Sequence, residues 1–269
     1  MREAYIVEAV RTPGCKRAKG LLAQTRPEDL LKTALAEVTD RVKVPKEAVE
    51  DVMAGCSFPE AEQGINIGRI ATLMAGYPIT ACGATVNRFC SSGLESIAIS
   101  SMKVMAGYHE VTIGAGIESM SIVPMGGNLP RPHPEWAKKD YTVYMSMGIT
   151  AENVARRYNV TREDQDHFAY HSHLKAGDAQ AKKLFTEIVP VEAYKFVAQK
   201  DGSYKKETYM VDYDDGVQAQ PDREKMGKLK GAFSAPIPGV ANSGSVTAAN
   251  SSQTTDGAAA TLKIESAHV

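Results

Sequence analysis

The chain has 269 residues, of which 43% are hydrophobic, and a formal net charge of −1. This length allows a sizeable buried core, in one large domain or two ordinary ones. Because acidic and basic residues are interspersed, no single-signed surface suggests nucleic acid or an anionic membrane as a partner. No apolar run approaches the roughly 18 residues of a membrane-spanning helix, so we expect a globular protein without a membrane span.

Cysteine usage and the N-terminus indicate a compartment. The four cysteines lack close, regular spacing, which fits a reducing cytoplasm better than a disulfide framework. A strand pattern begins at Ala4 and leaves no room for a targeting peptide. We therefore expect a cytoplasmic location.

Strand and helix patterns alternate over the first 119 residues. The expected strands are 4–10, 51–55, 84–87 and 111–116. The expected helices are 27–41, 66–75 and 91–106. Pro27 suits the first turn of its helix. Strands that alternate with helices predict an α/β fold, with a mixed, mostly parallel sheet covered by helices on both faces.

The alternation stops after residue 119. Glycines and prolines between 126 and 134 mark a loop. Helices are then expected near 149–158 and 162–183. The polar stretch 199–220 predicts a hairpin with Asp201-Gly202 as its turn.

A last core strand is expected at 258–264. It returns the chain to the sheet after the irregular stretch. We therefore expect a core domain formed by 1–119 and 246–269, with 120–245 as an inserted loop domain.

A cysteine at the start of a helix is the most informative feature of the sequence. A strand-like stretch stops at Cys90, where the positive pole of the following helix favours thiolate over thiol. Small residues at 91–93 leave the sulfur uncrowded. Four apolar residues are expected to fix this helix against the sheet: Leu94, Ile97, Ala98 and Val104. A nucleophile fits this position, and a buried, inert cysteine is the alternative.

The segment from Val86 to Ser96 resembles the nucleophile segment of the thiolase family, in particular its 3-ketoacyl-CoA branch. Three further segments resemble the family in the expected order. These are 114–121 with its Glu-Ser-Met sequence, 145–154, and 246–253 followed by Asp256-Gly257. The resemblance runs from residue 5 to 265 and implies the N-terminal domain and the loop domain of a thiolase.

The resemblance also implies the site and its chemistry. Cys90 is the implied nucleophile, which exchanges an acyl group with coenzyme A, and its backbone N–H is placed to help bind an oxyanion. The implied contacts to coenzyme A and substrate are Ser252, Ala248, Ala249, Met147, Leu229 and Phe233. For the apolar members, ordinary packing is an alternative that the sequence leaves open. Asn250 and Asp256 are expected only to fix the turn.

Two triplets of the family are missing from this sequence. Thiolases carry a basic histidine in Gly-His-Pro and a second cysteine in Cys-x-Gly, and neither triplet occurs here. We therefore expect the C-terminal thiolase domain to be absent and its residues to come from another chain, in an oligomer. The alternatives are a non-catalytic thiolase-fold subunit for assembly or acyl-CoA binding, and a truncated, inactive fragment.

No metal site and no tightly bound cofactor are expected, because coenzyme A enters as a substrate. His167 and His171 are four residues apart on an expected helix, with His173 nearby. No cysteine or carboxylate completes a tetrahedral set around them.

Overall fold

The computed structural model describes residues 2–233 and 244–265. They form two compact units. The sheet unit comprises Met1–Leu129, Thr186–Gly216 and Thr254–Val269. The helical unit comprises Pro130–Phe185 and Val217–Gln253.

A mixed sheet forms the centre of the sheet unit. Its strands, in spatial order, are β1 (Ala4–Arg11), β8 (Thr255–Glu265), β5 (Val111–Ser119), β3 (Asp51–Gly55) and β4 (Cys82–Val86). The short strand β2 (Cys15–Lys16) also pairs with β8. β3 runs parallel to β4 and β5, whereas β8 is antiparallel to β1 and β5. Thus β1, β3, β4 and β5 share one direction, and the predicted mostly parallel α/β sheet is confirmed.

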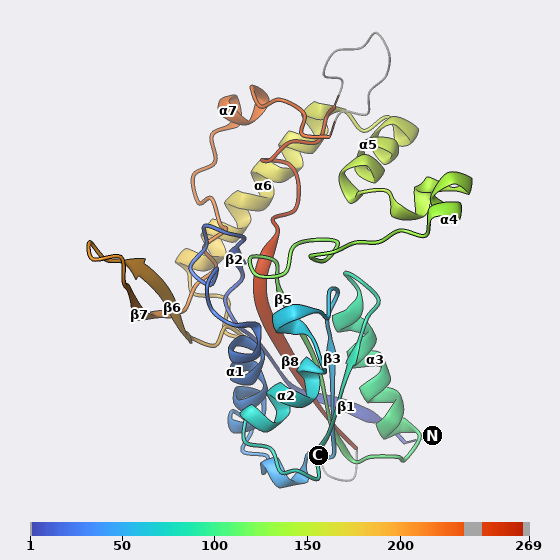
Figure 1. Cartoon of the computed structure of the whole chain (residues 1–269), viewed down its shortest axis with the longest axis vertical. Coiled ribbons are helices and arrows are strands. Elements are labelled where there is room, and N and C mark those ends of the chain that lie inside the picture. The colour runs from blue at the N-terminus through green and yellow to red at the C-terminus, as the bar shows by residue number, and fades with distance from the viewer. Residues whose placement is uncertain (1, 234–243, 266–269) are drawn as a thin grey trace. The chain divides into compact units, whose positions relative to one another are not determined.

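Helices cover both faces of this sheet. They are α1 (Pro27–Asp40), α2 (Ile67–Met74) and α3 (Ser92–Met105). Neighbouring residues of a strand point to opposite faces. A Cβ atom at Gly68 of α2 would lie 3.1 Å from that of Ala54, whereas one at Gly55 would overlap the Ser92 carbonyl of α3. Hence α2 and α3 lie on opposite faces (Figure 1).

The main hydrophobic core fills the space between the sheet and helices α1 and α2. Its fully buried members include Leu30, Leu31, Leu35, Val38, Ile67, Ile113 and Leu262. The strand residues among them alternate with residues that face α3, as the period of two requires. This core fixes the sheet whose opposite face supports α3.

Helix α3 packs on the sheet through serines. Ser96 Oγ donates to the Ala115 carbonyl at 2.7 Å, and Ser100 Oγ donates to the Ile113 carbonyl at 3.2 Å. Leu94 is 69% exposed and Ala98 is also exposed, so the prediction that these two residues fix the helix against the sheet is wrong. Glycines in the strands let the backbone of α3 approach the sheet closely, because a Cβ atom at Gly55 or Gly114 would overlap the α3 backbone.

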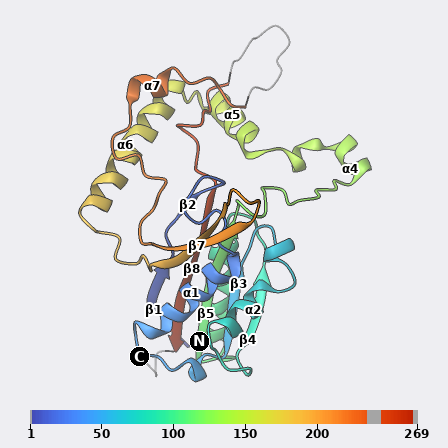
Figure 2. The same cartoon turned by 60° about the vertical axis from the view of Figure 1, so that its left-hand side comes forward.

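The predicted turn at Asp201-Gly202 is confirmed, but its hairpin is formed by β6 (Val191–Ala198) and β7 (Tyr204–Val211) rather than by the stretch 199–220. It belongs to the sheet unit and lies beyond the N-terminal end of α1 (Figure 2). Tyr209 donates its hydroxyl to the Leu21 carbonyl at 2.7 Å. The sequence pattern assigns the residues of this hairpin to the inserted domain 120–245. In the structure they belong with the sheet instead, because β6 and β7 contribute buried residues to the main core.

The helical unit contains α4 (Pro134–Lys139), α5 (Met147–Tyr158), α6 (Arg162–Ala181) and α7 (Arg223–Gly227). A capping box of Thr161 and Asp164 starts α6 at the position that the sequence predicts. Short 3₁₀ helices lie at Lys46–Ala48, Ala61–Gln63 and Tyr141–Tyr144. None of the helices in the described ranges combines the length and the apolarity needed to cross a membrane.

Candidate active site

Cys90 lies in a tight turn between β4 and α3. Ser91 is the N-cap of α3, so Cys90 directly precedes the cap. The side chain of Cys90 is exposed. Phe89 has φ +46°, a left-handed conformation that costs roughly 1–3 kcal/mol for a residue with a bulky side chain. Asn87 Oδ1 accepts the Phe89 N–H at 2.8 Å, and the Phe89 carbonyl accepts the Ser92 N–H at 2.9 Å. These bonds hold the strained turn that presents Cys90.

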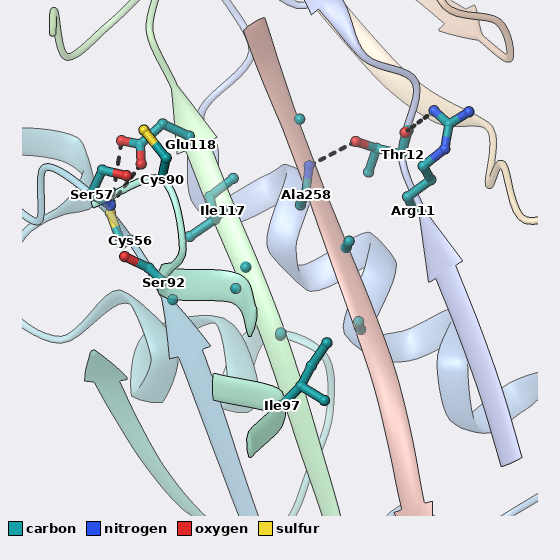
Figure 3. Close-up of a pocket in the computed structure, with 18 of the residues that line it drawn as sticks. Arg11, Thr12, Cys56, Ser57, Cys90, Ser92, Ile97, Ile117, Glu118 and Ala258 are labelled. Atoms are coloured by element: carbon teal, nitrogen blue, oxygen red, sulfur yellow. Dashed lines mark hydrogen bonds between the residues drawn. The ribbon is translucent and has the colours of Figure 1, made fainter. Parts of the chain in front are cut away.

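Glu118, at the end of β5, lies beside Cys90 (Figure 3). Its carboxylate accepts the Ser57 N–H at 2.7 Å and Gln63 Nε2 at 2.7 Å. Gln63 is fully buried and also accepts the Ser119 N–H at 2.5 Å. The Glu118 carboxylate is therefore held in one orientation next to the sulfur.

Sequence reasoning missed this role of Glu118 and Gln63. The available signal was the position of Glu118 at the carboxyl end of a strand, because the carboxyl ends of neighbouring parallel strands meet at one edge of a sheet. The ends of β3, β4 and β5 do meet there, and they bring Cys56, Cys90 and Glu118 into one site.

A cavity of about 380 Å³ opens beside the sulfur on the face of the sheet that carries α3. Its walls are mostly small and apolar, and include Cys90, Gly93, Gly116, Glu118, Ala259 and Thr261. A reactive carbon in this cavity could therefore approach the thiol without displacing a large side chain. The arrangement suits attack by sulfur on a carbonyl carbon.

The other cysteine of the cavity is a poor nucleophile. Cys56 is 1% exposed, and burial together with the charge of Glu118 raises the pKa of its thiol to about 12. Cys15 is fully buried, and burial, with a smaller effect of Asp215, raises its pKa to about 12 as well. Both thiols therefore stay protonated near neutral pH, and the expectation that Cys56 packs in the core is confirmed.

The predicted coenzyme A segment forms a compact loop in the helical unit. Asn250 Oδ1 accepts the Thr247 N–H at 2.6 Å, and Asn250 Nδ2 donates to the Ser245 carbonyl at 3.0 Å. The predicted turn-fixing role of Asn250 is thus confirmed. Ala248 and Ser252 are exposed and Ala249 is half-buried, so small side chains line the accessible side of the loop.

Met147, Leu229 and Phe233 belong to the same unit. Met147 is 59% exposed and Leu229 is 41% exposed, so these two residues do not form its core. Phe233 is half-buried, and its ring lies so close to Gly148 that a side chain there would overlap it. Phe233 therefore packs against Gly148 at the start of α5. Gly148 directly follows Met147 in the sequence. Cys90 lies in the sheet unit, whereas all six predicted contact residues lie in the helical unit.

Over residues 2–233 and 244–265, no three His, Cys, Asp or Glu side chains converge as a metal site would require. The rings of His167 and His171 have centroids 4.4 Å apart. His173 Nδ1 accepts the Gln218 N–H at 3.3 Å.

Comparison with known proteins identifies relatives along the whole chain. The family model described as "Thiolase, N-terminal domain" matches residues 4–267. A 3-ketoacyl-CoA thiolase of Bacillus subtilis (strain 168) is 44% identical over 98% of this chain and 66% of its own length. A peroxisomal 3-ketoacyl-CoA thiolase 2 of Arabidopsis thaliana is 38% identical over 97% of this chain and 54% of its own length.

A beta-ketoadipyl-CoA thiolase of Acinetobacter baylyi is 38% identical over 97% of this chain and 66% of its own length. The chain thus spans between 54% and 66% of the length of these three relatives. The match nevertheless includes both the strand-to-helix turn of Cys90 and the loop that carries Ser252. The chain belongs to the thiolase family, and its residues 4–267 correspond to the N-terminal thiolase domain.

Proposed function

We propose that this chain is the nucleophile-bearing part of a 3-ketoacyl-CoA thiolase and transfers an acyl group between Cys90 and coenzyme A. The observation that carries the proposal is the exposed Cys90, set before the N-cap of α3 and beside a cavity with small apolar walls. The similarity to two proteins named 3-ketoacyl-CoA thiolase supports the same substrate class.

In the proposed cleavage, the Cys90 thiolate attacks the 3-keto carbon of the substrate. The bond between C2 and C3 then breaks, and the acyl group stays on the Cys90 sulfur as a thioester. Acetyl-CoA leaves as its enolate, which takes up a proton. The thiol of a second coenzyme A gives its proton to a base, and its sulfur attacks the thioester on Cys90. The bond between the acyl carbon and the Cys90 sulfur then breaks, which releases the shortened acyl-CoA and restores the Cys90 thiolate. The positive end of α3 is proposed to favour negative charge on the Cys90 sulfur. The backbone N–H of Cys90 is proposed to stabilise the oxyanion.

This chemistry needs an acid and a base at two steps. Glu118 is close to the sulfur, but its carboxylate already accepts two hydrogen bonds that maintain the site. We therefore propose that a histidine and a second cysteine come from a C-terminal thiolase half on another chain, in an oligomeric assembly. The free cysteines in the described part of the chain support a reducing, cytoplasmic location.

We further propose that the loop 245–253 binds the pantetheine arm of coenzyme A. Ser252 supplies an exposed hydroxyl, whose one hydrogen bond within residues 2–233 and 244–265 is a long one of 3.4 Å to the Gln253 carbonyl. Ala248 and Ala249 allow an extended ligand to approach the backbone. We propose that Met147, Leu229 and Phe233 contact the acyl or pantetheine chain. We also propose that the reaction needs no metal and no tightly bound cofactor.

Turnover with and without a second half tests this function. The purified chain should cleave acetoacetyl-CoA negligibly, because a positioned acid or base typically contributes roughly 10²–10⁴-fold. Addition of a C-terminal thiolase half should produce activity that Cys90→Ser abolishes. Ordinary turnover by the chain on its own would contradict the need for a partner. A complex that binds acyl-CoA but never turns over would favour the non-catalytic alternative, and a chain that neither binds nor assembles would favour an inactive fragment.

A further inference from the structure

Two buried carboxylates hold the loop 245–250 of the helical unit. Glu152 of α5 is 5% exposed and Asp166 of α6 is 7% exposed. Carboxylates are rarely buried to this degree unless they are paired or hydrogen-bonded. Glu152 directs both carboxylate oxygens at the loop, and Asp166 directs one.

Glu152 binds the first residues of the loop. Its Oε1 accepts the Val246 N–H at 2.8 Å, and its Oε2 accepts the Ser245 N–H at 3.1 Å and the Ser245 hydroxyl at 2.9 Å. Burial would raise the pKa of this carboxyl, but the N–H of Val246, both donors of Ser245 and the charge of Arg156 lower it below its ordinary value. Glu152 is therefore ionised at neutral pH, and its hydrogen bonds to the loop are charge-assisted.

Asp166 binds the other end of the loop. Its Oδ1 accepts Asn250 Nδ2 at 2.8 Å, and its Oδ2 accepts Arg162 Nε at 2.7 Å. Arg162 also donates to the Leu229 carbonyl at 3.0 Å. The loop is therefore fixed at both ends by side chains of two consecutive helices, while Ala248, between these ends, is exposed.

We infer that Glu152 and Asp166 are positioning residues that preorganise the loop 245–253 for coenzyme A. This inference rests on the proposed binding of coenzyme A by that loop. Neither carboxylate is proposed to contact the ligand, since both are buried. They raise affinity because an already ordered loop loses less conformational freedom when an extended ligand binds.

Glu152→Gln tests the inference with little change in side-chain size. It removes the charge and places an amide donor against the Ser245 and Val246 N–H groups. We expect the 245–250 amides to exchange hydrogen faster in the free protein, and coenzyme A to bind about tenfold more weakly, as loss of charge-assisted bonds implies. Ser245→Ala should have a smaller effect of the same sign. Glu163→Gln is the matched control, because its side chain is 86% exposed on α6.

The full chain of each variant, and of Ser252→Ala, is used in three measurements. Calorimetric titration gives the affinity for coenzyme A, hydrogen exchange gives the order of the loop, and thermal unfolding gives the stability. Faster loop exchange with weaker binding, at an unchanged unfolding temperature, supports the inference. If Ser252→Ala weakens binding but Glu152→Gln and Ser245→Ala do not, the positioning role is wrong while the proposed site stands. If none of the three substitutions changes binding, the proposed site fails and the inference fails with it.

Discussion

The amine of Lys263 lies in the space that a side chain at position 114 would occupy, and Gly114 leaves that space free. Lys263 is fully buried on the face of the sheet that carries α3. In the part of the chain that the structure describes, its amine donates only to Thr261, at 3.0 Å to the carbonyl and also to the hydroxyl. Burial lowers the pKa of Lys263 from 10.5 to about 7.

This lysine should make the folded state less stable at neutral than at alkaline pH. Between pH 7 and 10.5 the unfolded chain binds the proton and the folded chain does not, so stability rises with pH over this range. Lys263→Met should therefore increase the free energy of unfolding at pH 7 by roughly 1–4 kcal/mol, and the gain should shrink as the pH approaches 10.5. Urea unfolding of both proteins across this range measures the difference. Lys205→Met, at an exposed position of β7, should show neither effect. A gain that does not depend on pH would contradict the buried neutral amine.

Gly55 controls the distance between β3 and the helix that follows Cys90. A Cβ atom at Gly55 would overlap the Ser92 carbonyl, so Gly55→Ala should push α3 away from the sheet. We expect a loss of roughly 1–3 kcal/mol in the free energy of unfolding, as for other overpacked sites. Gly93→Ala is the control, since its Cβ would meet no atom of the described residues within 4 Å beyond its chain neighbours and its own helix backbone, and it should be neutral or stabilising. Equal unfolding midpoints for the two variants would show that α3 does not pack as closely as described.

The four cysteines should differ in reactivity toward iodoacetamide. Cys82 and Cys90 are exposed, so both should be alkylated in the native protein at mildly alkaline pH. Cys15 and Cys56 should resist, because both are buried and their thiols have pKa values raised to about 12. Peptide mass mapping after timed labelling measures each site, and unfolding in urea should make all four accessible. Native labelling of Cys56 as rapid as that of Cys90 would be inconsistent with its burial.

Local sequence patterns were sufficient to predict most of the fold. The alternation of strands and helices placed β1, β3, β5, α1 and α3 within a few residues of their observed ends, because apolar periodicity and proline positions act locally. The orientation of α3 could not be predicted in this way. Apolar spacing points to Leu94, whereas the observed contact uses Ser96 and Ser100, since glycines of β3 and β5 set the distance.

For the candidate site as well, some residues could be predicted from the sequence and others could not. Cys90 could be predicted because its turn, helix and small neighbours are continuous in the sequence. Gln63 and Glu118 are 55 positions apart, and only the pairing of β3 with β5 brings them together. The strained Phe89 was also missed, because a left-handed conformation is not expected of a bulky residue without knowledge of the turn. Glu152 belongs to a segment that resembles the family, but its hydrogen bonds to Ser245 and Val246 depend on tertiary structure.

The residue that carries the acyl group shows most directly whether Cys90 is the nucleophile. The chain, with a C-terminal thiolase half if this is required, is incubated with an acyl-CoA, and the products are analysed by intact mass and peptide mapping. We predict one acyl group, bound as a hydroxylamine-sensitive thioester on Cys90 and absent from Cys90→Ser. Acylation of Cys15, Cys56 or Cys82 that persists in Cys90→Ser would contradict this prediction.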